Sequence, residues 1–456
     1  MPGRSSTIII TRIAPGHQQV AVEWTPVDGA VYQCVEVKLR GAGWDSARCV
    51  RCPAGLGTVT VPGLMNDADH VLRVTALDTE GKVLAVSGER LATPGWVPGT
   101  VIDYLHRDDT AFGEWGRYIG SPSVCRLPSA ALVASHDLFG PGPQCLTRVF
   151  RSEDEGASWR HLTDLHPAFW GKLFVHRGAL HLLATRTEYG DLLLYRAEDE
   201  GSSWAGPAVI APGTYHKAPV PVIEHRGRLW TCAELQTGGW PEGFQSVVCS
   251  APVEADLMRA ASWTVSAPLA YDPAWLPEGW EVARKDQGFL EGNAVVAPDG
   301  RLLNLLRYNT VPYANKAIVL EIAEDGRSQR FERVIDFPGG MTKFTVQRRL
   351  ETGVYWSLVN PVTILDKPNM RSVLSLASST DLRHWTVHRD VLRDDSPWAV
   401  QYTGFQYVDW LFDGPDLLAA CRLAYRGARN FHDANHLTFH RVEGFDALSG
   451  RGRVGN

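Results

Sequence analysis

Three side chains interrupt strand-like stretches of the sequence at points where a loop begins or ends. His136 ends an apolar run in VASHDLFGPG, Tyr189 precedes a turn in TRTEYGDLLLY, and His216 lies at a strand entrance in TYHKAPVPV. A His or Tyr at a strand end is well placed to transfer a proton. We therefore predict that His136, Tyr189 and His216 are catalytic. The alternatives are a hydrogen-bonded structural role for His136 and the capping of a hydrophobic edge by Tyr189.

Cationic and hydrogen-bonding side chains recur along the same part of the chain, about one group per repeat. Such groups suit a negatively charged ligand, and a carboxylated sugar is the natural candidate. For any single Arg or Lys, the alternative is a solvated position on the rim. The predicted substrate-binding residues are Lys217, Glu291, Asn293, Arg307, Lys343, Arg422 and His432.

The elements that must position these groups are short strands. From about residue 101 to 445 no long helical period occurs, and strand-like runs alternate with Gly, Pro, Asp and Asn. Two similar octapeptides, SEDEGASW and AEDEGSSW, place Asp154 and Asp199 45 positions apart. That distance is typical of one propeller blade, and roughly 345 residues at about 45 to 50 per blade predict about seven blades.

The octapeptides resemble the Asp box, SxDxGxxW, of sialidase-like propellers, and SSTDLRHW and APDGR are degenerate copies. The carboxylate can accept backbone N–H bonds in a tight hairpin, and Gly can adopt a positive φ. The resemblance implies turns on the outer rim of the propeller. We therefore expect Asp154 and Asp199 to be structural rather than catalytic.

The beginning of the chain follows another pattern. About seven short alternating strands, of which VAVEWTPV is one, predict a β-sandwich. Their order resembles a fibronectin type III domain, although His70 stands where that family carries a corner Tyr. We expect a packing or spacer module, with a sugar-binding module as the alternative. The expected all-β organisation is a sandwich over 1–95, a seven-bladed β-propeller over 96–446 and a C-terminal tail over 447–456.

Composition and charge limit the class of function. The 456 residues carry a net charge of −6, with 44% hydrophobic and 21% charged residues, so we expect ordered domains and no nucleic-acid partner. No apolar run is long enough to span a membrane. The N-terminal stretch lacks the apolar segment of a secretory signal, which favours the cytoplasm, whereas fibronectin-like modules are more familiar outside the cell. We expect a monomer.

The eight cysteines are scattered through the chain. Cys49 and Cys52 form one CxxC pair, and no second pair is spaced to complete a zinc site. We interpret all eight as mostly reduced, buried or indifferent thiols. No metal and no organic cofactor are expected.

Motifs along the propeller segment resemble those of seven-bladed propellers that act on L-rhamnose-α-1,4-D-glucuronate ends of arabinogalactan and gum arabic. The similar stretches are SPSV, ASHDLFG, YHKAPVPV, LEGN, DFPGG and NFHDANHLTFHR. That group includes lyases and a related rhamnosidase group, and propeller ulvan lyases are more distantly similar. The resemblance implies that His136 transfers a proton, that Tyr189 lies in the channel and that Asn293 contacts a carboxylate or hydroxyl.

Two departures from the known patterns bear on the reaction. Ser121-Pro122-Ser123 stands where a sialidase carries Arg-Ile-Pro, which disfavours a sialidase. Gly116 and Arg117 stand where the lyases often carry a second His, so lyase and hydrolase chemistry both stay open. We assign Arg117 to the carboxylate clamp.

The expected reaction is β-elimination at a uronate. A His or Tyr near C5 accepts the proton, cations or donors stabilise the charge that develops on the carboxylate, and a His or Tyr protonates the departing rhamnose. One alternative is hydrolysis, which usually needs two carboxylates about 5 to 10 Å apart; its candidates are Glu188, Glu234 and Glu291. The other is a non-catalytic glycan-binding propeller. In each case the expected partner is a uronic-acid-containing oligosaccharide or polysaccharide.

Overall fold

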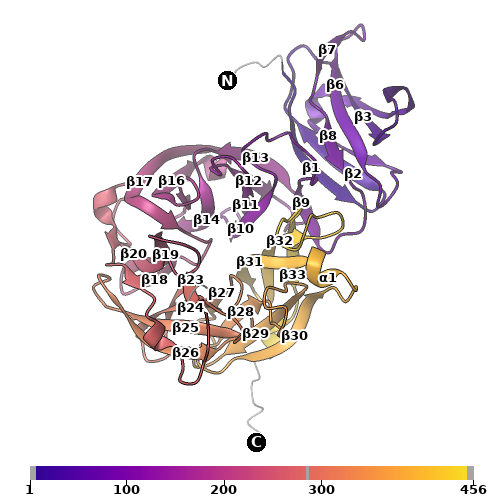
Figure 1. Ribbon diagram of the computed structural model, residues 1–456. Helices are drawn as coiled ribbons and strands as arrows, with labels where there is room; N and C mark the ends of the chain where they lie inside the picture. Colours follow the sequence, from indigo (N-terminus) through magenta and orange to yellow (C-terminus); the bar gives the residue numbers. More distant parts are fainter. Residues whose placement is uncertain (1–6, 284–286, 449–456) are drawn as a thin grey trace, which may run out of the picture.

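The computed structural model describes residues 7–283 and 287–448 (Figure 1). In this part the chain is almost entirely β-structure, with one short α-helix, α1 (Ala399–Tyr402), and several single-turn 3-10 helices. No helix in these ranges is long and apolar enough to cross a membrane. The predicted all-β class is therefore confirmed.

The N-terminal region consists of two sheets around one core. Val20, Val22 and Trp24 of VAVEWTPV are buried in that core, as the alternation of the strand predicts. One sheet has the order β1-β2-β5, and the other has the order β4-β3-β6-β7 with β8 beside β6. Membership of the fibronectin type III family stays a prediction. The strands are β1 (Ile10–Gly16), β2 (Gln19–Trp24), β3 (Tyr32–Leu39), β4 (Arg48–Pro53), β5 (Thr58–Pro62), β6 (His70–Leu77), β7 (Val83–Val86) and β8 (Arg90–Ala92).

A β-propeller follows, with its blades arranged around a central axis (Figure 1). The first blade contains β10 (Tyr118–Arg126), β11 (Leu132–Phe139), β12 (Thr147–Ser152) and β13 (Arg160–Leu165). The second contains β14 (Phe169–His176), β15 (Ala179–Thr185), β16 (Gly190–Glu198) and β17 (Ser203–His216). The end of β17 pairs with the third blade, which contains β18 (Ile223–His225), β19 (Arg228–Gln236), β20 (Phe244–Pro252), β21 (Thr264–Val265) and β22 (Leu269–Ala270).

Three further blades complete the ring. The fourth contains β23 (Gln287–Val296), β24 (Leu302–Thr310), β25 (Lys316–Ile322) and β26 (Gln329–Asp336). The fifth contains β27 (Thr345–Arg348), β28 (Tyr355–Val359), β29 (Val373–Ser379) and β30 (Thr386–Arg393). The last contains β31 (Gly404–Asp413), β32 (Asp416–Ala424), β33 (His436–Val442) and β9 (Thr100–Tyr104). Because β9 pairs with β33, the beginning of the propeller closes its last blade.

The sheets of the described residues make six blades, rather than the seven predicted. The spacing of 45 residues between the first two Asp boxes is the repeat length of two compact neighbouring blades. Other blades carry long connections, such as residues 360–372 and 425–435, which lengthen the repeat. Dividing the length by the compact spacing therefore overcounts the blades.

The Asp boxes form structural turns, as predicted. Asp154 Oδ1 accepts a hydrogen bond from the backbone N–H of Ser158 at 2.8 Å, and Trp159 is buried beneath the turn. Asp199 begins a one-turn 3-10 helix, and Trp204 Nε1 donates to a carbonyl of that helix at 2.9 Å. These local bonds stabilise the outer hairpins of the blades.

One disulfide corrects the interpretation of the cysteines. Cys34 in β3 is joined to Cys49 in the neighbouring strand β4, with Cα atoms 6.0 Å apart. Strand pairing brings these two residues within bonding distance. Cys52 of the CxxC pair is a free, buried thiol, so that pair does not act as a unit.

The sandwich lies against the first and last blades (Figure 1). Arg12 Nη2 donates to the carbonyl of Val101 at 2.9 Å, and the buried pair Arg90–Asp109 has a nitrogen–oxygen distance of 2.6 Å. Polar contacts of this kind join the sandwich to the propeller.

Candidate active site

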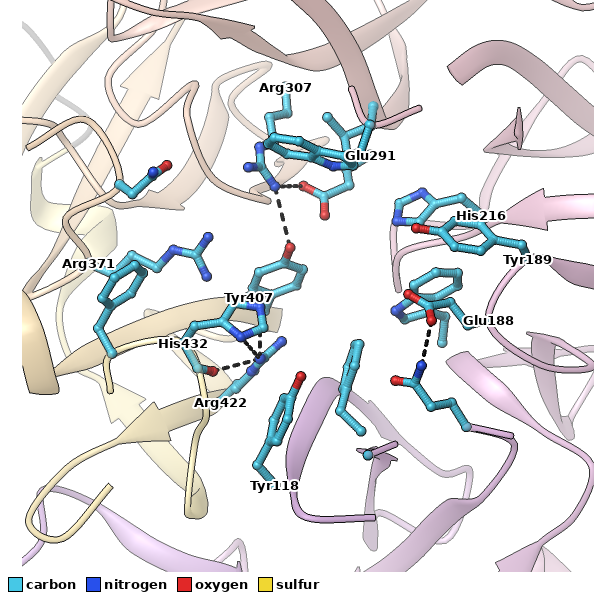
Figure 2. A pocket seen from close by; sticks show the side chains of 18 residues that line it. Tyr118, Glu188, Tyr189, His216, Glu291, Arg307, Arg371, Tyr407, Arg422 and His432 are labelled. Atoms are coloured by element: carbon cyan, nitrogen blue, oxygen red, sulfur yellow. Dashed lines mark hydrogen bonds and ion pairs between the residues drawn. The ribbon is translucent and has the colours of Figure 1, made fainter. Parts of the chain in front are cut away.

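A cavity of about 480 Å³ opens where the inner strands and loops of all six blades converge (Figure 2). Aromatic and charged side chains dominate its lining. The lining residues are Tyr118, Phe139, Gly140, Gln144, Trp170, Glu188, Tyr189, His216, Trp240, Leu290, Glu291, Arg307, Asn369, Arg371, Tyr407, Arg422, Phe431 and His432. This "central pocket" is the candidate active site.

Bulges in the inner strands direct several of these side chains into the central pocket. The pairing of the innermost strand shifts register in the first, second, fourth and last blades, between Ile119 and Pro122, Phe169 and Lys172, Leu290 and Asn293, and Gln406 and Asp409. Trp170, Glu291 and Tyr407 lie inside these bulges with φ of 52°, 59° and 57°. A bulged residue leaves the regular alternation of a strand, which is how these three side chains reach the cavity.

Three buried arginines, Arg307, Arg371 and Arg422, lie on one side of the central pocket (Figure 2). Within the described residues, the Nε atom of each arginine has no hydrogen-bond acceptor. Burial, together with the charges of Arg307 and Arg422, lowers the pKa of Arg371 to about 10 against the opposing effect of Tyr407. The positive charge here is therefore incompletely balanced, and an anionic ligand would stabilise it.

Tyr407 and Glu291 lie beside the first of these arginines. Arg307 Nη1 donates to Glu291 Oε2 at 3.1 Å and to the Tyr407 hydroxyl at 3.4 Å. Burial opposes ionisation of Glu291, but Arg307, His216 and a hydrogen bond from Tyr407 outweigh it, so the pKa of Glu291 is lowered. Burial and the Glu291 charge raise the pKa of Tyr407. A protonated phenol thus faces an ionised carboxylate that can accept its proton.

Glu188, Tyr189 and His216 lie across the pocket from the arginines (Figure 2). His216 Nδ1 is 2.7 Å from Glu234 Oε2, and this contact fixes the orientation of the imidazole. Gln144 donates a hydrogen bond to Glu188. Burial, followed by the nearby Glu188, raises the pKa of Tyr189 to about 12, so Tyr189 is a proton donor near neutral pH.

The structure brings six of the predicted residues together and leaves five outside the cavity. Those that line it are Tyr189, His216, Glu291, Arg307, Arg422 and His432. Those that do not are His136, Arg117, Lys217, Asn293 and Lys343.

His136 is fully buried and belongs to another set of contacts. Its Nε2 is 3.0 Å from Asp103 Oδ2, its Nδ1 is 3.0 Å from the carbonyl of Asp137, and its ring stacks on Phe150. We therefore do not place His136 among the groups that touch a ligand in the central pocket. Its neighbour on β11, Asp137, lies on the pocket side, where its Oδ1 accepts the backbone N–H of Ser121 at 3.0 Å.

Internal contacts also explain the positions of the other outlying residues. Asn293 joins neighbouring inner strands, because its Oδ1 accepts the Val346 N–H at 3.0 Å. Lys343 Nζ donates to the Val408 carbonyl at 3.0 Å, and Lys217 is buried beside Thr231. Arg117 directly precedes Tyr118, whose side chain lines the pocket in its place.

Tyr407 and Arg371 line the central pocket but were not predicted from the sequence. Both carry the signal that identified the other candidates, a polar residue next to a strand-like run. Tyr407 lies in GFQYVDWLF, and Arg371 directly precedes SVLSLASS. Trp170 and Tyr118 were also missed, because nothing in the sequence distinguishes an aromatic residue that lines a pocket from one in the core.

No group of three or more His, Cys, Asp or Glu side chains in the described part of the chain is arranged to hold a metal ion.

Comparisons with known proteins agree with the fold. No family model matches the chain, and no curated protein matches it. Among solved structures, the Hadza microbial sialidase Hz136 is similar with a TM-score of 0.51 and 12% identity over 96% of each chain. The K499G mutant of the NanB sialidase from Streptococcus pneumoniae has a TM-score of 0.50 and 10% identity over 96% of this chain and 92% of that one. The chain thus has the fold of the sialidase-like propellers.

Proposed function

We propose that the central pocket binds the carboxylate-bearing sugar of a glycan and hydrolyses its glycosidic bond. The observation that carries this proposal is the group of three buried arginines beside the Tyr407–Glu291 pair. The similarity in fold to sialidases supports a carbohydrate substrate.

The arginines supply recognition of an anionic sugar. A guanidinium presents parallel N–H donors that match the two oxygens of a carboxylate. The Nε donors without acceptors and the lowered pKa of Arg371 both indicate that an anion would be stabilised here. A neutral sugar would leave these charges unbalanced.

Tyr407 is the proposed nucleophile. Its hydroxyl donates to Glu291, which can accept the proton as the phenolic oxygen attacks the anomeric carbon. A neutral phenol avoids the repulsion that a carboxylate nucleophile would experience from an anionic sugar, and sialidases are a recognised exception of this kind to the two-carboxylate rule. Arg307, which contacts both Glu291 and Tyr407, stabilises the negative charge that develops on them.

The opposite wall supplies the proposed proton donor. Glu188 lies across the pocket from Tyr407, with Gln144 holding its carboxylate (Figure 2). In the first step, protonated Glu188 donates a proton to the departing oxygen. In the second step, the resulting carboxylate activates the water that releases the sugar from Tyr407.

A second candidate function is β-elimination at a uronate. The observation that favours it is the His216–Glu234 pair, which holds an imidazole beside Tyr189 and opposite the arginines. In this reaction His216 accepts the C5 proton of the bound uronate and Tyr189 protonates the leaving group. The arginines would stabilise the charge on the carboxylate in the same way.

The products distinguish the two candidates. The protein would be incubated with aryl glycosides of sialic acid and of glucuronic acid, and with a rhamnosyl-glucuronate oligosaccharide. Release of the aryl group or a reducing sugar, without the ultraviolet absorbance of an unsaturated uronate, supports hydrolysis. A rise in that absorbance supports elimination and overturns the hydrolase. Saturable binding of these sugars without any product would overturn both reactions in favour of a glycan-binding propeller.

A further inference from the structure

A second cavity, of about 720 Å³, lies between the sandwich and the last blades. Three parts of the chain that are distant in sequence line it. The sandwich contributes Asp67 and Asp69, the connection between β9 and β10 contributes His106, and the propeller contributes residues 394–403 and 425–428. Helix α1 belongs to the propeller part and lies beside the last blade, on the side of the sandwich (Figure 1). We refer to this cavity as the "junction groove".

Exposed aromatic rings line the junction groove. Trp398 is 62% exposed and Tyr402 is 40% exposed, although both belong to an ordered segment around α1. Tyr425 lies on another part of the lining, edge-on to Trp96 with ring centroids 6.4 Å apart. Large exposed aromatic rings in a concave site are typical of ligand contacts, and their flat faces fit the C–H faces of sugar rings.

Several charged groups of the junction groove are held in ion pairs and hydrogen bonds. Asp67 pairs with Arg426 at 2.7 Å, and Asp69 lies 3.2 Å from His106 Nε2 and accepts the Thr93 hydroxyl at 2.8 Å. Paired carboxylates and guanidiniums keep further lone pairs and N–H donors for hydroxyl groups. The three clustered arginines of the central pocket share one carboxylate of its lining, Glu291, which pairs with Arg307. The junction groove therefore fits a neutral, hydroxyl-rich ligand.

One loop forms part of both cavities. The connection between β32 and β33 supplies Tyr425 and Arg426 to the junction groove and Phe431 and His432 to the central pocket. The backbone N–H of Phe431 donates to the carbonyl of Gln401 in α1 at 2.8 Å, which ties this loop to the aromatic segment. A glycan that crosses the loop can therefore contact both cavities.

We propose that the junction groove is an accessory carbohydrate site. It binds neutral sugar residues of the glycan whose acidic residue enters the central pocket, by stacking on Trp398 and Tyr402. The role of the second site in catalysis rests on the proposed function, whereas the binding of neutral sugars does not. The sandwich is then more than a spacer, since it forms one wall of the site.

Binding of neutral oligosaccharides tests the proposal directly. The full-length protein would be titrated calorimetrically with galacto-, arabino-, xylo- and gluco-oligosaccharides. We expect at least one series to bind, and Trp398→Ala or Tyr402→Ala to weaken that binding about tenfold or more. The matched control is Tyr32→Ala, which removes an exposed Tyr of the sandwich outside the junction groove and should bind as the unmodified chain does.

Three outcomes would overturn the accessory site. They are no binding of any of the four series, unchanged binding by both groove variants, and a preference of the groove for acidic over neutral oligosaccharides. Cleavage assays separate this proposal from the proposed function. Trp398→Ala should raise KM for a polymeric substrate about tenfold and leave the turnover of a small aryl glycoside unchanged. Loss of neutral-sugar binding in a chain that cleaves no acidic glycoside would support the groove and reject the hydrolase.

Discussion

Two clusters of buried charge differ in how their charges are balanced. The central pocket holds Arg307 and Glu291, whose side chains are 4% and 1% exposed. The second cluster lies where the blades meet the sandwich, outside the junction groove, and we call it the junction cluster. It holds Arg148 and Asp103, each with a side chain 2% exposed. Burial alone therefore does not separate a site that binds a ligand from one that stabilises the fold.

Charge balance separates the two clusters. At the junction, Arg148 contacts both Asp103 and Asp164, and these carboxylates outweigh burial, so the pKa of Arg148 is raised. In the central pocket Glu291 likewise outweighs burial and raises the pKa of Arg307, whereas burial and two like charges lower the pKa of Arg371. The junction cluster satisfies its own charges, whereas we propose that an anionic ligand completes the charge balance of the central pocket. The same contrast explains why His136, which looked catalytic in the sequence, belongs to the structural cluster.

The largest expected effect is the loss of activity when Tyr407 loses its hydroxyl. Tyr407→Phe should lower kcat for an acidic aryl glycoside about 10³-fold or more, because it removes the hydroxyl that contacts both Glu291 and Arg307. The melting temperature should change little. Tyr355→Phe is the matched control, because its hydroxyl is bonded to the Val296 carbonyl at 2.6 Å, outside the pocket. Near-normal turnover by Tyr407→Phe would exclude Tyr407 as the nucleophile.

The next effect concerns stability at the junction. Arg148→Met should lower the free energy of unfolding by about 3–5 kcal/mol, because it leaves Asp103 buried without its main partner. Turnover at a temperature where the variant is folded should be nearly unchanged. Arg151→Met on the same strand is the control, since Arg151 pairs with the exposed Glu153 and Glu200 and should cost about 1 kcal/mol or less. Urea unfolding measures both variants. Equal losses in the free energy of unfolding would show that the buried pair of Arg148 contributes no more stability than the exposed pairs of Arg151.

An Arg→Met substitution in the central pocket should impair substrate binding and leave stability nearly unchanged. Arg371→Met should change the free energy of unfolding by less than about 1 kcal/mol and raise KM for an acidic substrate about 10- to 100-fold, because it removes charged hydrogen bonds to the ligand. The methyl ester of the same substrate should bind both proteins equally weakly. An equal loss of affinity for acid and ester would mean that Arg371 does not contact the carboxylate.

Much of the architecture could be predicted from the sequence, because it depends on local patterns. VAVEWTPV identifies a strand of the sandwich, and the Asp boxes identify the outer hairpins of a propeller through bonds within eight residues. The number of blades could not be predicted in this way, because loops such as 360–372 carry no period.

The site was predicted in part, for a related reason. A polar residue beside an apolar run identifies a strand near the axis but not the face on which its side chain lies. A bulge changes that face for Glu291 and Tyr407, and the sequence shows no bulge. His136 and Asp137 are adjacent, and alternation sends one to the junction and the other below the pocket. The pattern therefore identified the correct strand, and the side chain beneath the pocket is that of Asp137.

The smallest expected effect is on the pH dependence of the free energy of unfolding, to which the two buried aspartates Asp137 and Asp103 contribute differently. Burial raises the pKa of Asp137 to about 7 despite the opposing charge of Arg422, whereas Arg148 and His136 overcome burial and lower the pKa of Asp103. The stability contributed by protonated Asp137 is complete below its unfolded pKa and is lost as the pH rises through about 7. That of ionised Asp103 is present above its unfolded pKa and is lost as the pH falls below it.

Of these two aspartates, only Asp137 should therefore contribute to the slope between pH 6 and pH 7, with a loss of about 1 kcal/mol that opposes the gain from the buried histidines, whose pKa values burial lowers. Asp137→Asn should remove this contribution to the slope in urea unfolding, whereas Asp103→Asn should lower stability at both pH values and keep the slope. An unchanged slope in Asp137→Asn would place the titration elsewhere. If Asp103→Asn removed the slope instead, the aspartate that titrates between pH 6 and pH 7 would be Asp103 of the junction cluster and not Asp137.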